Sequence, residues 1–266
     1  MGRVSQIWKR HRRKIVGAVA LLAAAAITPP IAYTVNHTKG EYRTLQLLDQ
    51  LHAQEGIPTD DREISTLMAM VRKESSFYRS AIGRDREVGL LQLQASLAQD
   101  RGLQVQNRTY PHSEKLEELF YLEPEGLAAR DQRFDAGENL RIGAAYFHEL
   151  AQSFERTYGM APEPAREFGM IAYNLGVGNV RKLLRNKYST DPGSFIARLA
   201  TEDLSAEGIS DRKRRVAVEY YTKNHSWQAT YATRLADMRA QGDPGIGQYI
   251  RAFPSCTVEL VRRTLH

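Results

Sequence analysis

The sequence predicts an all-α fold preceded by one N-terminal transmembrane helix. Apolar residues recur at steps of three and four along most of the chain, and no segment sustains the alternation of apolar and polar residues that marks a half-buried strand. The chain has 266 residues, of which 42% are hydrophobic and 26% charged, so it is long and apolar enough for a buried core. These proportions exclude wholesale disorder and a multi-span membrane protein.

The positive charge of the chain is concentrated at its N-terminus. The net charge is +6, and residues 1–35 contain six basic residues and no acid: Arg3, Lys9, Arg10, Arg12, Arg13 and Lys14. Subtracting these 6 from 37 leaves 31 Lys and Arg against 31 Asp and Glu, so the rest of the chain is neutral. Nucleic-acid binding therefore loses its main support, and we expect no nucleic-acid partner.

Residues 15–35 are predicted to be a transmembrane signal anchor. This run of 21 residues has no charged side chain, and as a helix it would be about 31 Å long, enough to cross a bilayer. The basic cluster before it predicts that residues 1–14 are a cytoplasmic tail and that the body lies across the membrane, in the periplasm of a bacterium. A cleaved signal peptide is the alternative, because Ala24 to Ala26 supply small residues, but the length of the run favours the anchor.

The segment after the anchor contains two predicted helices. Residues 36–59 are expected to form a juxtamembrane helix, in which Leu45, Leu48 and Leu51 share one face. Asp60 and Glu63 resemble a capping box, which predicts a helix over about 61–78. The apolar stripe of this second helix consists of Ile64, Leu67, Met68 and Val71.

The rest of the body is also predicted to be helical, apart from a mixed segment over 97–134 that is interrupted by glycine and proline. Further helices are expected over 136–155, 165–173, 179–187, 194–200, 212–240 and 246–253. A glycine-containing turn, Asn174 to Gly178, separates the second of these from the third.

Cysteine and histidine usage excludes several kinds of site. Cys256 is the single cysteine, so the chain has no internal disulfide and no zinc site with several thiolates. The seven histidines contain no HxxxH pair, which argues against a zinc hydrolase. We therefore expect no metal and no cofactor.

Glu74 is the strongest candidate for chemistry. It follows Val71 by three residues and Leu67 by seven, which places it beside the buried stripe at the end of the predicted helix. A carboxyl group against an apolar surface should have a raised pKa, as a general acid needs near neutral pH. Four segments occur around it and after it in a fixed order: Glu74 to Phe77, Gly89 to Leu93, Glu138 to Tyr146, and Ala172 to Val180.

In this order the four segments resemble the landmarks of the soluble-type (SLT domain) lytic transglycosylases of bacterial cell walls, a lysozyme-like family. The landmarks are a Glu-Ser pair, a Gly-Leu-Met-Gln-like stretch, an Asn-Ile-x-x-Gly-x-x-Tyr-like helix and an Ala-Tyr-Asn-Ala-Gly-like turn. The resemblance covers about 60–96 and 135–185. It implies a lysozyme-like domain over 60–266, in which insertions lie near 97–134 and 187–245.

The resemblance also implies which residues form the site. Glu74 matches the sole catalytic acid and base, and Ser75 is expected to form a hydrogen bond near it. The expected substrate-binding residues are Ser75, Gln92, Tyr146, Tyr173, Asn174 and a late tyrosine. Tyr231 and Tyr249 both compete for that last position, and Tyr231 needs the smaller insertion.

The resembled family implies a reaction on the peptidoglycan glycan strand, at the MurNAc–GlcNAc β-1,4 bond. Glu74 would protonate the glycosidic oxygen and then, as a carboxylate, take the proton of the C6 hydroxyl, which closes a 1,6-anhydro ring on the muramic acid. A goose-type lysozyme hydrolase is the first alternative, because Asp85 or Glu87 could position a water molecule. Two others are a catalytically idle glycan-binding or assembly domain and a wall-opening enzyme that serves an envelope-spanning secretion or conjugation machine, with envelope secretion or division proteins as partners.

Overall fold

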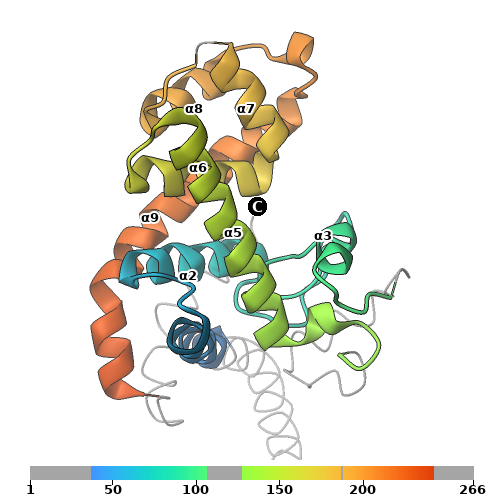
Figure 1. Ribbon diagram of the computed structural model, residues 1–266, viewed down its shortest axis with the longest axis vertical. Helices are drawn as coiled ribbons and strands as arrows, with labels where there is room; N and C mark the ends of the chain where they lie inside the picture. The colour runs from blue at the N-terminus through green and yellow to red at the C-terminus, as the bar shows by residue number, and fades with distance from the viewer. Residues whose placement is uncertain (1–36, 107–127, 187, 243–266) are drawn as a thin grey trace, which may run out of the picture.

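The computed structural model describes residues 37–106, 128–186 and 188–242, and this part of the chain is helical (Figure 1). After a helix over residues 37–55 come α2 (Asp61–Ser75), α3 (Ala95–Asp100), α5 (Ala136–Tyr158), α6 (Pro162–Leu175), α7 (Val177–Arg185), α8 (Pro192–Thr201) and α9 (Asp211–Gln241). Two short 3₁₀ helices, η2 (Gln132–Phe134) and η3 (Ser205–Glu207), interrupt the connections. Two isolated antiparallel bridges, Ile82–Val88 and Val88–Leu93, are the β structure of this part. The all-α prediction is confirmed there.

Two predicted helices, over 15–35 and 246–253, lie outside the described residues. Among the helices that are described, none combines the length and the apolar composition that crossing a bilayer requires.

Helix α2 begins as its sequence predicts. The side chain of Asp60 caps it by accepting a hydrogen bond of 2.7 Å from the Glu63 backbone N–H. The Glu63 carboxylate reaches one residue further back than in a standard capping box and accepts from the Thr59 N–H at 2.7 Å. The helix ends at Ser75, three residues early, because Ser76 (φ 54°) and Phe77 (φ 67°) adopt left-handed backbone conformations. Glu74 therefore occupies the last turn.

The core lies between α2 and α9 on one side and between α5 and α6 on the other. The predicted stripe of α2 is buried, and α2 packs chiefly against α9. In Figure 1, α9 runs from beside α8, past α2, to the opposite end of the molecule. Helices α5 and α6 pack antiparallel against one another, and α6 also packs against α7 and α9.

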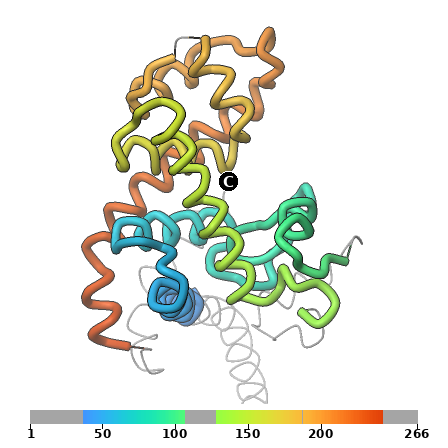
Figure 2. The backbone as a smooth tube through the Cα atoms, viewed as in Figure 1, coloured from blue at the N-terminus to red at the C-terminus, as the bar shows by residue number. Residues whose placement is uncertain are grey.

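The helix over 37–55 is packed into this body. Leu45 and Leu48 are buried, and the blue helix lies beside the red end of α9 in Figure 2. The Tyr231 hydroxyl donates to Glu41 at 2.7 Å, and Arg239 pairs with Asp49 at 2.7 Å. The segment predicted as a juxtamembrane connection is therefore held against α9.

The two segments expected as insertions lie partly within the described residues. Within 187–245, α8 and α9 contribute Phe195, Leu199, Ala217 and Tyr220 to the buried core. This part of the chain is part of the packed body, because α9 is the helix against which α2 chiefly packs. Within 97–134, α3 and η2 are described, and residues 107–127 lie outside the described part.

Candidate active site

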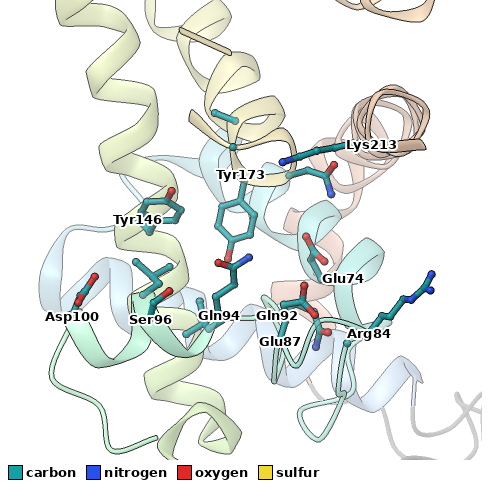
Figure 3. A pocket seen from close by; sticks show the side chains of 16 residues that line it. Glu74, Arg84, Glu87, Gln92, Gln94, Ser96, Asp100, Tyr146, Tyr173 and Lys213 are labelled. Carbon is teal, nitrogen blue, oxygen red and sulfur yellow. The ribbon is translucent and has the colours of Figure 1, made fainter. Parts of the chain in front are cut away.

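A cleft of about 740 Å³ lies where the end of α2, the loop over 81–94, α3, α5, α6 and the start of α9 meet (Figure 3). Its polar and charged lining is supplied by Glu74, Arg84, Glu87, Gln92, Gln94, Ser96, Asp100, Tyr146, Tyr173, Asn174 and Lys213. Five of the sequence-predicted site residues are thus brought together: Glu74, Gln92, Tyr146, Tyr173 and Asn174.

Glu74 has the electrostatic setting of a general acid. Its side chain opens onto the cleft, while protein surrounds it on the other sides. Burial raises the pKa of Glu74 from 4.5 to about 7, and the negative charge of Glu87 also raises it. Hydrogen bonding from Tyr220 and the charge of Lys73 oppose this rise. At neutral pH the carboxyl group is therefore close to its midpoint and can both give and take a proton.

Tyr220, which sequence reasoning missed, contacts Glu74 from the buried side. It lies on α9 and is 1% exposed. Its hydroxyl has no hydrogen bond of regular geometry among the described residues, but it is close enough to the Glu74 carboxyl to act on the pKa of that group as a hydrogen-bond donor. Burial and the charge of Glu74 raise the pKa of Tyr220 well above its usual value, so the phenol stays protonated.

The prediction of Tyr231 as the late tyrosine is wrong. Tyr231 is fully buried, donates to Glu41 and packs edge-on against Phe77, with ring centroids 6.3 Å apart. It does not line the cleft. Tyr220 and Tyr231 are eleven residues apart in one helix, which is about three turns. They therefore lie on the same face of the helix, about 16 Å from each other along its axis. Tyr249, the competing candidate, lies outside the described residues.

The prediction of Ser75 as a substrate contact is also wrong. Its side chain is buried and donates a hydrogen bond of 3.1 Å to the Val71 carbonyl of the same helix. A helix turns by about 100° per residue, so Ser75 points toward the core when its neighbour Glu74 points into the cleft.

Gln92 and Glu87 come together in the loop over 81–94. The Gln92 side-chain N–H groups donate to the Ala81 carbonyl at 3.1 Å and the Gly89 carbonyl at 2.8 Å. The nitrogen of this amide therefore stabilises the loop backbone. The Gln92 amide oxygen and the Glu87 carboxylate both crowd against Gly83, where a Cβ atom would approach them to 2.5 and 2.3 Å. A side chain at position 83 would therefore displace these two polar groups from where they now lie.

Asn139 fixes this loop from α5. Its side-chain oxygen accepts from the Leu91 N–H at 2.8 Å, and its amide donates to the Val88 and Arg133 carbonyls at 2.8 and 2.9 Å. Arg133 is itself buried in a two-bond ion pair with Asp131, with distances of 3.0 and 2.7 Å. Asn139 lies in the third landmark segment, but nothing in the sequence revealed that its partner is the second landmark.

Two tyrosines connect the loop to the opposite wall. The Tyr173 hydroxyl donates to the Leu91 carbonyl at 2.8 Å, and its ring lies 5.7 Å from that of Tyr146. Both rings line the cleft, as the sequence predicts, while the hydroxyl of Tyr173 is used by the protein itself.

The two extra acids of the loop have different positions. Asp85 is exposed and lies outside the cleft lining, and its backbone N–H donates to the Glu87 carboxylate at 3.0 Å. Glu87 is therefore the second carboxylate of the cleft on the side of Glu74. Within residues 37–106, 128–186 and 188–242, no three His, Cys, Asp or Glu side chains are grouped as metal ligands.

An all-helical body with a glutamic acid of raised pKa in a cleft is typical of enzymes that cleave glycosidic bonds by acid catalysis. The chain belongs to the Transglycosylase SLT domain family, whose model matches residues 54–196. No curated protein matches the chain. Membership indicates a transglycosylase-type enzyme that binds peptidoglycan. The matched span contains Glu74, Gln92 and Tyr173 but ends before α9, so Tyr220 lies beyond it.

Proposed function

We propose that this protein is a membrane-anchored lytic transglycosylase that cleaves the MurNAc–GlcNAc β-1,4 bond of peptidoglycan and leaves 1,6-anhydromuramic acid ends. The observation that carries the proposal is Glu74, a single carboxyl group with a pKa of about 7 that opens onto the cleft of a transglycosylase-family fold. The anchor is the uncharged run over 15–35, and it would hold the catalytic body in the periplasm.

One carboxyl group can serve both proton transfers of this reaction. Protonated Glu74 donates to the glycosidic oxygen as the bond from that oxygen to C1 of the muramic acid breaks. The resulting carboxylate then takes the proton of the C6 hydroxyl, whose oxygen forms the new bond to C1. Glu74 ends protonated, as it began, and no water is consumed. A pKa near the working pH is the condition under which one group performs both steps well.

The residues around Glu74 would stabilise its carboxylate and bind the sugar units. Tyr220 is positioned to donate to the carboxylate that exists between the two proton transfers. Gln92 and the two tyrosine rings of Tyr146 and Tyr173 line the surface on which the sugar units would lie. A sugar ring stacks on an aromatic face with little loss of rotamer freedom, because a tyrosine has few rotatable bonds.

A hydrolase of goose-lysozyme type is the second candidate, and Glu87 is the observation that favours it. A carboxylate in the same cleft as the acid could activate a water molecule for attack at C1. Asp85, the other acid considered for this role, is exposed and does not line the cleft, so Glu87 is the candidate for activating water.

Mass spectrometry of the products distinguishes these functions. Purified full-length protein in detergent is incubated with peptidoglycan, and the released glycan ends are identified. Anhydromuramoyl ends support the transglycosylase, and reducing ends that disappear in Glu87→Gln support the hydrolase. If a folded protein releases neither kind of end, the proposed function is wrong.

A further inference from the structure

Lys213 brings a positive charge to the cleft. It lies in the first turn of α9 and lines the same cleft as Glu74. Figure 3 shows its side chain extending from α9 above Glu74 toward the wall that carries Tyr173. Arg84, the other cation of the lining, extends outward, away from Gln92 and Tyr173. Lys213 is thus the cation that faces the interior of the cleft among its described lining residues.

The fold does not use this charge. Lys213 has no ion pair with a carboxylate of the described residues, although carboxylates are near it in sequence. Asp211 pairs with Arg214 and with Arg215, the latter at 2.8 Å, and Glu219 pairs with Lys73 and Lys223. A lysine in the first turn also stands at the positive end of the helix dipole, where a cation is disfavoured.

The acids of the cleft do not neutralise it either. Glu74 is half-protonated at neutral pH, Glu87 is turned toward Gly83 and the Asp85 N–H, and Asp100 lies on α3 beyond Tyr146. The exposed ammonium group of Lys213 therefore forms a positive region at one wall of the cleft. That region favours an anionic group on a bound ligand.

We propose that Lys213 binds a carboxylate of the peptide stem carried by the glycan strand, so that the enzyme prefers strands whose stem carboxylates are free to strands whose stem carboxylates are converted to amides. The inference rests on the proposed function, because it takes peptidoglycan as the ligand of this cleft. The sugar backbone between the stems has no carboxylate of its own once the lactyl group is joined to the peptide. A cation in the cleft therefore recognises the stem.

The test compares the full-length enzyme and three variants on stem-bearing strands and on the same strands after coupling with methylamine has converted the stem carboxylates to uncharged amides. The measured quantity is the ratio of kcat/KM on the two substrates. In Lys213→Gln this ratio should fall about three- to tenfold, as expected for one charged hydrogen bond at a partly exposed site. Lys213→Arg, which keeps the charge, should restore most of the ratio, and added salt should reduce it in the wild type.

Arg212→Gln is the matched control, because Arg212 carries the same charge one residue earlier, is exposed and does not line the cleft. It should leave the ratio at the wild-type value. An equal fall in Arg212→Gln and Lys213→Gln, or an unchanged ratio in Lys213→Gln, would overturn the inference.

A binding measurement separates this inference from the proposed function. Sedimentation with insoluble peptidoglycan, with its stem carboxylates either free or converted to amides, is measured for Glu74→Gln and for Glu74→Gln with Lys213→Gln. Weaker binding of the double variant to the material with free carboxylates, and to that material alone, supports the role of Lys213 even if the wild type cleaves neither substrate. Equal binding of the two variants to both materials contradicts it, whatever the products of the wild type are.

Discussion

The pKa of Glu74 lies near 7 because some of its surroundings raise it and others lower it. Burial and Glu87 raise its pKa, and Tyr220 and Lys73 lower it, which gives a value of about 7. Because the proposed reaction needs this group first as an acid and then as a base, its protonation equilibrium controls both steps.

Glu74→Gln should abolish most of the activity. The change keeps the size of the side chain and removes the transferable proton, and general acid–base catalysis is worth about 10²- to 10⁴-fold. Anhydromuropeptide release at equal concentrations of folded protein measures the loss. A variant that keeps more than a tenth of the wild-type rate would show that Glu74 is not the acid, and Glu87→Gln would then be tested in its place.

The same substitution should stabilise the protein, but only where Glu74 is ionised. A carboxyl group whose pKa is raised in the folded state destabilises folding increasingly as pH rises from 4.5 to about 7, and above this range the penalty is complete. Glu74→Gln should therefore raise the free energy of unfolding by on the order of 2 kcal/mol at pH 8 and leave it unchanged at pH 4. Urea unfolding at the two pH values gives the difference. A gain of equal size at both would contradict the assignment of the pKa shift to Glu74.

Glu87→Gln and Tyr220→Phe should move the pH profile of activity in opposite directions. The alkaline limb of kcat/KM reports the loss of the proton from Glu74 in the free enzyme. Removing the Glu87 charge lowers the pKa of Glu74 and moves this limb to lower pH, whereas removing the Tyr220 hydroxyl raises that pKa and moves the limb to higher pH. The measurement is kcat/KM from pH 5 to pH 9 (roughly two units on either side of the Glu74 pKa). Shifts in the same direction would exclude the proposed pair of influences.

At the scale of elements, the loop over 81–94 is shaped by helices that lie elsewhere in the sequence. Asn139 and Arg133 hold its backbone from the α5 side, and Tyr173 holds it from α6. Gly143 of α5 lets the loop approach, because a Cβ atom there would come within 2.4 Å of the Leu91 side chain. The landmark segments of the sequence are therefore parts of one packed unit around the site.

Asn139→Ala should destabilise this unit. It leaves the Leu91 N–H and the Val88 and Arg133 carbonyls without their buried partner, which costs about 2 to 4 kcal/mol in the free energy of unfolding. Glu138→Ala is the control, because Glu138 is at the surface of the same turn and pairs with Arg141. The free energy of unfolding of the two variants is compared by thermal unfolding. A similar small loss of stability in both would show that the Asn139 hydrogen bonds are weak.

At the scale of the whole molecule, the terminal segments of the described chain are tied together. The helix over 37–55 and the end of α9 share the hydrogen bond of Tyr42 to Gln241 and the ion pair of Arg239 with Asp49. If residues 15–35 anchor the chain, the catalytic body joins the membrane through a helix that is part of its own structure.

The proposed topology places the N-terminus in the cytoplasm and the body outside it. A reporter enzyme that is active only outside the cytoplasm should be active when fused after His266, and the protein should fractionate with the inner membrane. The basic cluster before the apolar run is the physical reason. A shortened protein released in soluble form would show that residues 15–35 are a cleaved signal.

Much of the fold could be predicted because it depends on local interactions. The Asp60 cap, the buried stripe of α2 and the long helix over 212–240 follow from side chains within a few turns of one another. The placement of Glu74 at the end of α2 followed from the same pattern. The helix boundaries shifted by a few residues where the backbone turns left-handed, as at Ser76, which composition does not reveal.

The sequence by itself determined the helical class, the candidate acid Glu74 and the family landmarks, because each depends on spacing within a single segment. Only the tertiary structure decided which tyrosine of α9 meets Glu74, since Tyr220 and Tyr231 share one helix face and differ only in where that helix crosses α2. It also decided that Ser75 serves the core, that Glu87 rather than Asp85 enters the cleft, and that Lys213 faces the site. These outcomes depend on contacts between distant segments, and the helical period carries no information about them.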